Sequence, residues 1–276
     1  MTASIANAEE LQHSSILGLG VYRPERVVTN DEICRQIDST DEWIRVRSGI
    51  RNRRFAGPDE TVIDMATAAG RDALRASQVS ADQIGCERAS EFVDLTDKST
   101  AFIFADGAGA VVVGASPQAG IGPVEWGSDG SLAHVLAQEL SWTEFRDNPT
   151  GPHPWVKFNG PAVFRWATVE MEKIARAALD RAGVTVEQLD AFIAHQANRR
   201  ITEAISKRLK LLPSTVVARD IVDAGKTSAA SVPLAVETLL RTGRAHAGDT
   251  GLLIGFGAGL TYAAQVVTLP AAPDDP

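Results

Sequence analysis

The chain has 276 residues, of which 44% are hydrophobic and 22% are charged, and its formal net charge is −8. This composition is typical of a globular protein built as one large domain or as two fused halves. The negative charge argues against general binding to nucleic acids. No apolar run approaches the roughly 18 residues that a membrane-spanning helix requires.

Residues 1–15 include Glu9 and Glu10 and lack the basic and apolar pattern of an export signal. The chain has two cysteines, Cys34 and Cys86, which are too few for a framework of disulfides. We therefore expect a cytoplasmic protein that does not associate with membranes.

The first part of the chain is predicted to contain strands and helices in this order: a strand at 16–20, helix starts at Asn30 and Thr40, an Ala-rich helix at 61–77, and strands at 101–104 and 109–114. Capping side chains and acidic residues in the first turn indicate the two helix starts. Asp106-Gly107, between the last two strands, is typical of a hairpin turn.

The second part of the chain is predicted to contain these elements: a strand at 121–127, a helix at 161–182, a strand at 190–194, helices at 201–209 and 228–242, and strands at 251–255 and 262–268. Strands thus alternate with helices along the sequence. This alternation predicts an α/β fold with a mostly parallel sheet.

A weak internal repeat divides the chain into residues 15–115 and 120–270. In both parts a helix is followed by a short turn and an acidic-Gln-apolar sequence, at 82–84 and 187–189. In the second part a strand, two helices and a hairpin come next, whereas in the first part no strand is expected before the hairpin. If the two parts are repeats, the first lacks on the order of 50 residues, between Gly85 and Cys86.

The stretch from Ala194 to Arg200 is the most informative part of the sequence for function. His195 follows an apolar run at 189–194 and places a neutral base where a strand meets a loop. An amide and two arginines come next, and this combination suits chemistry on an anionic, carrier-bound substrate. A lone histidine after a strand is more often structural, so the neighbouring motifs have to decide between these two interpretations.

Eight motifs in the chain resemble those of β-ketoacyl-acyl-carrier-protein (ACP) synthase III, a condensing enzyme of the thiolase fold. In chain order they are Tyr22-Arg23-Pro24-Glu25, Thr40-Asp41-Glu42-Trp43-Ile44, Arg47-Ser48-Gly49-Ile50, Phe104-Ala105-Asp106-Gly107-Ala108-Gly109-Ala110, Gly160-Pro161-Ala162-Val163-Phe164, His195-Gln196-Ala197-Asn198, Thr227-Ser228-Ala229-Ala230-Ser231 and Gly255-Phe256-Gly257-Ala258-Gly259. The resemblance implies a thiolase-like αβαβα layered fold of two similar halves, with the first half, 15–115, incomplete.

The resemblance also implies the reaction. Enzymes of this family transfer an acyl group from acyl-CoA to a cysteine and condense it with malonyl-ACP, with loss of carbon dioxide, to start fatty acid or polyketide synthesis. A His and an Asn donate hydrogen bonds to the malonyl thioester carbonyl. The family needs no cofactor and no metal, since the coenzyme A thioester is a substrate, and its members form homodimers.

Site residues follow from the same resemblance. His195 corresponds to the catalytic His, and Lys226 stands where the family has its Asn. Trp43 and Arg47 match positions that hold the adenine and phosphates of coenzyme A. The expected ACP-binding residues are Gln196, Ala197, Asn198, Arg199 and Arg200. Because a desolvated ammonium is unfavourable unless it is paired, we expect the Lys226 side chain to turn toward solvent.

Two departures from the family pattern leave an alternative open. No Ala-Cys-Ala-Gly-like nucleophile segment occurs in the chain, and Cys86 is disfavoured as a replacement because Glu87 beside it opposes a thiolate. The alternative is a catalytically inactive relative that retains at most ACP binding or malonyl decarboxylation. A basic group, Arg51, Arg53 and Arg54, is interpreted either as a solvated face or as a contact to coenzyme A phosphates.

Overall fold

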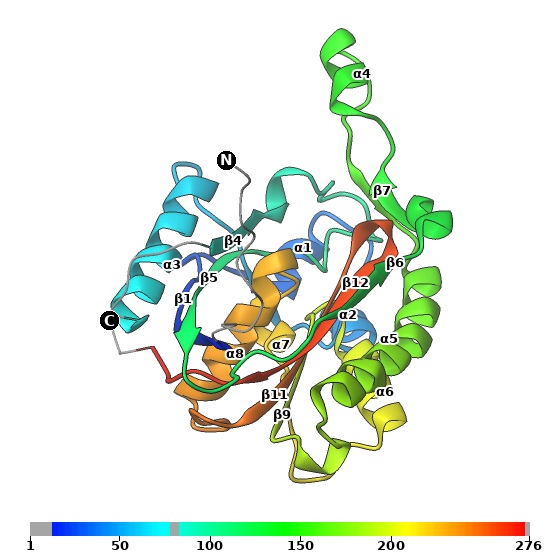
Figure 1. Cartoon of the computed structure of the whole chain (residues 1–276). Helices are drawn as coiled ribbons and strands as arrows, with labels where there is room; N and C mark the ends of the chain where they lie inside the picture. Colours follow the sequence, from blue (N-terminus) through cyan, green and yellow to red (C-terminus); the bar gives the residue numbers. More distant parts are fainter. Residues whose placement is uncertain (1–12, 78–82, 274–276) are drawn as a thin grey trace, which may run out of the picture.

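The structure, a computed structural model, describes residues 13–77 and 83–273, and for residues 83–89 it describes the backbone alone. Two main sheets form its centre (Figure 1). The first has the order β1–β5–β4, and its strands are β1 (His13–Tyr22), β5 (Asp106–Ser116) and β4 (Gln83–Arg88). The second has the order β10–β9–β11–β12–β6, and its strands are β10 (Val216–Val217), β9 (Ala191–Ala194), β11 (Thr250–Phe256), β12 (Thr261–Thr268) and β6 (Glu125–Ser128).

Helices and sheets alternate in five layers (Figure 1). Helix α3 (Val62–Ser77) covers the outer face of the first sheet. Helix α8 (Ser231–Arg241) lies between the sheets and contacts both β1 and β5 on one side and β9 and β11 on the other. Helices α5 (Gly160–Ala182) and α6 (Arg199–Leu209) cover the outer face of the second sheet. The predicted αβαβα arrangement is therefore confirmed.

The packing of α3 on the first sheet follows from small residues. Met65, Ala69 and Ala73 recur at helical spacing on α3 and are buried against alternate residues of β5. The backbone of β1 comes so close to α3 that a Cβ atom at Gly20 would lie 2.2 Å from the Ala69 carbonyl oxygen. Glycine at this position is therefore a packing requirement rather than a turn signal.

The prediction of a mostly parallel sheet was wrong. Among the strand pairs of the described residues, β10–β9 and β9–β11 are parallel, whereas β12 and β6 join the second sheet antiparallel and both pairs of the first sheet are antiparallel. The reason is local, because β11 and β12 are separated by only four residues, and so short a connection can join antiparallel strands only.

The hairpin turn predicted at Asp106-Gly107 was also wrong, because both residues begin β5. The Asp106 carboxylate is buried and accepts hydrogen bonds from the backbone nitrogens of Ala56 (2.8 Å) and Ser90 (2.9 Å) and from the Ser90 hydroxyl (2.7 Å). Gly107 lets the strand approach α8, since a Cβ atom there would lie 3.0 Å from the Leu234 side chain. The apolar residues 101–104 form no strand and pack in a cluster with the first two helices.

A strand does follow α3, contrary to expectation, because β4 begins after residues 78–82. The order β4–β5–β1 matches the order β11–β12–β6 in the second sheet. Beyond β11 the second sheet continues with β9 and β10, whereas within the described residues no strand pairs with the outer edge of β4. The first sheet thus has three of the five strand positions that the second sheet has.

The other elements lie outside the two main sheets. Two short helices begin where the capping signals predict: α1 (Asn30–Cys34) and α2 (Asp41–Ser48), capped by Thr29 and Thr40. The remaining pieces are β2 (Val27–Thr29), β3 (Asn52–Arg54), α7 (Ile221–Ala224), and the projecting arm of β7 (Leu136–Gln138), α4 (Trp142–Asp147) and β8 (Val156–Phe158), seen in Figure 1. Among them β2 pairs with β3 and β7 with β8, in two separate two-stranded sheets. In the part of the chain that the structure describes, no helix has the length and hydrophobicity needed to cross a bilayer.

Candidate active site

His195 lies directly after β9, whose four residues are all buried. Its backbone nitrogen donates a hydrogen bond to the Ile254 carbonyl oxygen (2.6 Å), which continues the pairing of β9 with β11. The imidazole ring is 7% exposed and packs edge-on against Phe256, with 5.2 Å between ring centroids. The end of the central parallel strand therefore fixes the position of this ring.

Ser231, the first residue of α8, orients the imidazole. Its Oγ lies 2.6 Å from Nδ1 of His195 and also accepts a hydrogen bond from the Gln196 backbone nitrogen (3.3 Å). A hydroxyl has one donor and two acceptor sites, so Ser231 Oγ can accept from that nitrogen and still donate its own proton to Nδ1. This arrangement favours the tautomer that carries its proton on Nε2 and can donate from there.

The charge state of His195 is set by its surroundings. Burial and the nearby Lys226 ammonium together lower the pKa of His195 from 6.5 to about 3. The imidazole is therefore neutral near pH 7 and acts as a hydrogen-bond donor and not as a cation.

Lys226 is buried, so the expectation that it turns toward solvent was wrong. Its Nζ lies 4.3 Å from the ring centroid of Phe104 and 5.4 Å from that of Phe158, and the residue is 7% exposed. The backbone around it is fixed by hydrogen bonds to the loop before β5, from the Lys226 nitrogen to the Ile103 carbonyl oxygen (2.9 Å) and from the Ala105 nitrogen to the Lys226 carbonyl oxygen (3.0 Å). Two aromatic faces thus compensate part of the desolvation of the ammonium.

His195 and Lys226 line the same cavity, of about 640 Å³, which we call the inner cavity. Most of its other lining residues are aromatic, small or aliphatic, and include Phe92, Phe104, Trp126, Val156, Ser231, Val232, Phe256 and Tyr262. Two polar donors in an otherwise largely apolar cavity form an environment in which hydrogen bonds to a developing negative charge are strong.

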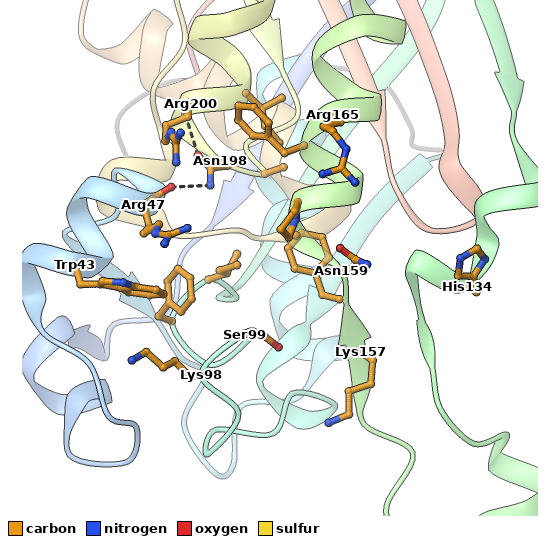
Figure 2. Close-up of a pocket in the computed structure, with 18 of the residues that line it drawn as sticks. Trp43, Arg47, Lys98, Ser99, His134, Lys157, Asn159, Arg165, Asn198 and Arg200 are labelled. Carbon is orange, nitrogen blue, oxygen red and sulfur yellow. Dashed lines mark hydrogen bonds between the residues drawn. The ribbon is translucent and has the colours of Figure 1, made fainter.

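A second pocket of about 820 Å³, the outer pocket, is shown in Figure 2. Its basic lining residues come from α2, α5, α6 and two other segments, and they are Arg47, Lys98, Lys157, Arg165 and Arg200. The Trp43 indole has the Arg47 guanidinium and the Lys98 ammonium each 5.2 Å from its ring centroid. A half-buried indole among cations is suited to a nucleotide base with attached phosphates.

The two pockets come near each other at Lys226. Phe158 lines the outer pocket and Phe104 lines the inner cavity, and the Lys226 ammonium lies over both rings.

The predicted ACP-binding residues do not act as one group. Gln196 is only 1% exposed, and its amide donates to the Ala194 carbonyl oxygen (2.7 Å) and accepts from the Ile221 nitrogen (3.1 Å). Because a buried amide cannot contact a carrier protein, Gln196 has a positioning role instead. It attaches the start of α7 to the His195 loop.

The other four residues of that group lie closer to the surface. Ala197, Asn198 and Arg200 line the outer pocket, whereas Arg199 forms an ion pair with Glu203 on α6 (3.3 Å). Asn198 accepts from the Arg200 backbone nitrogen (2.9 Å) and donates to the Arg47 carbonyl oxygen (3.0 Å), as Figure 2 shows. This amide therefore joins α6 to α2, and Arg47 and Arg200 from these two helices both line the outer pocket.

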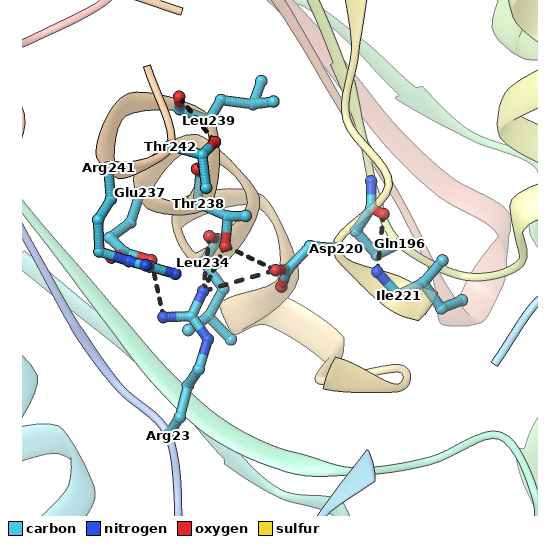
Figure 3. Close-up of polar contacts among 10 residues, drawn as sticks. All are labelled: Arg23, Gln196, Asp220, Ile221, Leu234, Glu237, Thr238, Leu239, Arg241 and Thr242. Carbon is cyan, nitrogen blue, oxygen red and sulfur yellow. Dashed lines mark hydrogen bonds and ion pairs between the residues drawn. The ribbon is translucent and has the colours of Figure 1, made fainter. Parts of the chain in front are cut away.

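A polar network supports α7 from the other side (Figure 3). Arg23 donates to Glu237 (2.7 Å) and to Thr238 (2.8 Å) on α8, and the Thr238 hydroxyl donates to Asp220 (2.7 Å). Gln196, just after β9, and Asp220, which is bonded to α8, thus fix the beginning of α7. Lys226 comes shortly after α7, so its position depends on both β9 and α8.

Comparisons with known proteins agree on one family. Residues 179–269 match the family described as 3-oxoacyl-[acyl-carrier-protein (ACP)] synthase III C terminal, and residues 77–130 match 3-oxoacyl-[ACP] synthase III. The mycobacterial β-ketoacyl-ACP synthase III of Mycobacterium avium is 44% identical over 319 residues, covering 92% of this chain and 95% of the relative. This chain belongs to the β-ketoacyl-ACP synthase III family.

Two further relatives extend the comparison. The synthase III of Mycobacterium tuberculosis is 44% identical and covers 96% of this chain and 98% of its own length. The crystal structure of the priming β-ketosynthase from the R1128 polyketide biosynthetic pathway superposes with a TM-score of 0.92 at 37% identity, covering 97% of this chain and 99% of that one. The synthase III of Aquifex aeolicus gives a TM-score of 0.83 at 29% identity.

Cys34, the cysteine whose side chain the structure describes, is not among the residues that line the inner cavity. Cys34 lies in α1 against an apolar cluster, and burial, followed by the charges of Asp31 and Asp41, raises the pKa of its thiol. Cys86 lies in β4 at the register position opposite Ala108, and its side chain is outside the described residues. No group of His, Cys, Asp or Glu side chains within the described part of the chain could hold a metal ion.

Several residues that line the outer pocket belong to no sequence motif that could have identified them. Lys98, Lys157 and Arg165 reach the outer pocket from separate segments, and only the folded chain brings them together.

Both interpretations of Arg53 were wrong, because this side chain is fully buried, and burial lowers its pKa to about 10. It donates to the Thr29 carbonyl oxygen (3.2 Å) and holds β3 against β2.

Arg51 and Arg54, on either side of Arg53 in the sequence, also lie outside the outer pocket. Arg51 forms an ion pair with Asp223 (2.7 Å), which fits the interpretation as a solvated face, and Arg54 donates to the Pro24 carbonyl oxygen (2.9 Å). Neither is among the residues that line the outer pocket.

Proposed function

We propose that this chain condenses an acyl group delivered by coenzyme A with malonyl-ACP, at the start of fatty acid or polyketide synthesis. The observation that carries the proposal is the position of Lys226, which lines the inner cavity with the neutral, buried His195 and lies 5.4 Å from the Phe158 ring of the basic, Trp43-lined outer pocket. The relatives named as β-ketoacyl-ACP synthases support it, and they give the catalytically inactive alternative no support.

Coenzyme A has an adenine, phosphates and a long flexible arm that ends in a thioester. The Trp43 indole offers a stacking surface for the base, and Arg47 and Arg200 offer guanidinium groups for the phosphates. The thioester at the end of the arm, or at the end of the similar arm on ACP, would pass the Phe158 ring and reach the inner cavity.

His195 and Lys226 would act on the malonyl thioester. When carbon dioxide leaves, the electron pair of the broken C–C bond forms an enolate, and its negative charge gathers on the thioester oxygen. The Nε2–H of His195 and the ammonium of Lys226 are donors that can stabilise this oxygen without reorganisation. The enolate carbon then attacks the acyl carbonyl carbon, a C–C bond forms, and the thiol that held the acyl group leaves.

The chain has no Ala-Cys-Ala-Gly-like segment that would supply the thiol acceptor for the acyl group. We infer that the first half, residues 15–115, lacks a block at the junction of Gly85 and Cys86 that the second half, 120–270, retains. The three strand positions of the first sheet support this inference. So does the alignment with the M. avium relative, because 92% of this chain is about 254 residues, whereas the alignment runs over 319.

The partner surface and the assembly are also proposals. Arg199 and Arg200 at the start of α6 and the exposed Lys207, Arg208 and Lys210 at its end form a basic edge that would attract the acidic surface of a carrier protein. Homodimer formation and a cytoplasmic location remain predictions drawn from the family resemblance and the composition.

The test measures the decarboxylation of malonyl-ACP and the condensation separately. Purified chain is incubated with acetyl-CoA and malonyl-ACP, and mass spectrometry of the carrier measures β-ketoacyl-ACP and acetyl-ACP, the product of decarboxylation alone. We expect both products to depend on His195, so that His195→Ala removes them while Arg54→Met, outside both pockets, does not. Neither product above the level without protein would contradict the proposal.

A further inference from the structure

A cavity of about 440 Å³ lies beside the C-terminal half of α8, whereas Ser231, the partner of His195, is at the start of that helix. We call it the arginine pocket, because its lining includes Arg23, Arg51, Arg54, Arg219, Arg241 and Arg244. None of its described lining residues lines the inner cavity or the outer pocket. The arginine pocket is therefore separate from the candidate active site.

Four of these arginines are bonded within the protein. Arg23 and Arg241 each bind one carboxylate oxygen of the buried Glu237, at 2.7 and 2.8 Å (Figure 3). Arg51 forms an ion pair with an aspartate of α7 (2.7 Å), and Arg54 donates to two backbone carbonyl oxygens (2.9 and 3.0 Å). These four side chains hold the walls of the pocket in place.

Arg219 and Arg244 differ from the other four. Both are exposed, and within the described residues neither guanidinium has a hydrogen bond or an ion pair. Two positive charges that share one pocket repel each other, and an anion placed between them removes that repulsion. The pocket therefore has cationic donors that the fold itself does not use.

The carboxylates of the pocket do not compete for these two donors. Asp220 and Asp223 also line it, but Asp220 accepts from the Thr238 hydroxyl (2.7 Å) and lies 3.6 Å from Arg23, and Asp223 is the partner of Arg51. Each negative charge thus has its own arginine. The charge of Arg219 and Arg244 remains uncompensated, in a chain whose net charge is −8.

The backbone holds both residues at the pocket. Arg244 follows α8, and its nitrogen donates to the Leu239 carbonyl oxygen (2.9 Å) past Gly243, whose φ of 64° ends the helix. Arg219 lies between β10 and α7, and its carbonyl oxygen accepts from the Val222 nitrogen (3.2 Å). Only the side chains of the two arginines have to be ordered when a ligand binds.

The donors and the size of the pocket indicate the class of ligand. A planar guanidinium donates two parallel hydrogen bonds to one phosphate, so two guanidinium groups suit two linked phosphates. A cavity of about 440 Å³ is in the range of small-molecule sites, and Val222, Ala235 and Leu239 give it an aliphatic wall. Such a recess admits a small ligand more readily than the surface of a folded partner.

We propose that the arginine pocket binds a small molecule with a diphosphate group, held by Arg219 and Arg244. The proposal does not depend on the proposed function, because the two sites share no described lining residue.

Calorimetric titration of the full chain with inorganic pyrophosphate, in buffer without magnesium, tests the proposal. We expect pyrophosphate to bind at least about tenfold more tightly than inorganic phosphate, which can engage only one of the two guanidinium groups. Arg219→Gln and Arg244→Gln should each weaken the binding of pyrophosphate at least about tenfold, the effect of losing one charge-assisted hydrogen bond. Both side chains are exposed, so thermal unfolding of these variants should match that of the unmodified chain.

Three further variants serve as controls. Arg71→Gln and Arg208→Gln remove the same charge from exposed positions on α3 and α6, outside the arginine pocket, and should keep the affinity within about twofold. Arg47→Gln alters the outer pocket and should also leave pyrophosphate binding unchanged. In this last variant, tighter binding of ADP than of pyrophosphate would identify a diphosphate ester as the ligand, and the reverse order would identify the free anion.

Four results would overturn the proposal. They are no binding of pyrophosphate, equal affinity for pyrophosphate and phosphate, binding that survives in both Arg219→Gln and Arg244→Gln, and an equal loss in Arg71→Gln, which would show general attraction of anions. Binding of ACP that Arg219→Gln weakens, without any binding of pyrophosphate, would assign the pocket to a protein partner instead.

Discussion

Lys226 and His195 form a pair in which each residue changes what the other can do. A desolvated ammonium over two aromatic rings gains on the order of 2 kcal/mol from cation–π attraction, which offsets part of its burial. The same positive charge disfavours a proton on His195 and keeps that ring neutral. Two donors, one cationic and one neutral, therefore coexist in the inner cavity without mutual repulsion.

Replacement of Lys226 by Met tests its role as an oxyanion donor. The variant keeps the chain length and loses the ammonium, so we expect decarboxylation of malonyl-ACP to fall by about 100- to 1,000-fold, the usual effect of losing one such donor. Lys226→Asn supplies a neutral donor and should retain more of the rate. Lys98→Met removes a cation over Trp43 in the outer pocket and should leave the turnover rate unchanged. A Lys226→Met rate equal to that of the unmodified chain would refute this assignment.

The lowered pKa of His195 also makes stability depend on pH. In the unfolded chain the ring takes up a proton near pH 6.5, whereas in the folded chain it does so only near 3. The stabilising contribution is therefore complete above about pH 6.5 and is lost as the pH falls toward 3, at up to about 1.4 kcal/mol per pH unit. Urea unfolding at pH 7 and pH 5 should show a smaller pH effect in His195→Gln, and an identical effect in both proteins would exclude this linkage.

At the scale of single elements, the close contact between β1 and α3 depends on glycine. A Cβ atom at Gly20 would lie 2.2 Å from the Ala69 carbonyl oxygen and 2.2 Å from the Ala73 nitrogen, and neither backbone atom can move aside cheaply. We expect Gly20→Ala to destabilise the fold by about 1–3 kcal/mol or more, as overpacking does. Gly130→Ala, where a Cβ atom would meet nothing within 4 Å, is the control in urea unfolding. Equal midpoints for the two variants would rule out this contact.

Elements with local signals were predictable from the sequence, and those with distant partners were not. Thr29 and Thr40 cap α1 and α2 through side-chain hydrogen bonds within three residues, so the pattern alone marks them. Asp106, by contrast, accepts hydrogen bonds from Ala56 and Ser90, and a turn signal cannot be distinguished from a buried carboxylate without those partners. The burial of Lys226 was missed for the same reason, because Phe158 comes from an arm 68 positions away.

The functional residues also divide into those with a local sequence signal and those that depend on distant partners. His195 was found because it follows a buried strand and is accompanied by Gln196 and Asn198. The role of Gln196 was misjudged, since its burial depends on Ile221 of α7. The cavity of about 430 Å³ between the two sheets could not be predicted, because it depends on residues of both sheets and on no single stretch of sequence.

For the whole molecule, α8 is the element that both sheets share. Its buried residues contact β1 and β5 on one side and β9 and β11 on the other, and Arg23 fastens it to the first part of the chain through Glu237. Apolar surface on either sheet is therefore exposed to water if α8 detaches. We infer that the two sheets unfold together rather than as separate units.

Leu234→Ala tests this coupling. Leu234 is fully buried on α8, where it contacts the β5 region near Gly107, so truncation should cost about 2–5 kcal/mol. Because α8 is common to both sheets, hydrogen exchange should show the same loss of protection for amides of β5 and of β11, although Leu234 faces the first sheet. Leu212→Ala, at a partly exposed leucine, should change neither. Loss of protection confined to β5 would show that the two sheets open independently, and the cavity between them would then be a cleft between separate units.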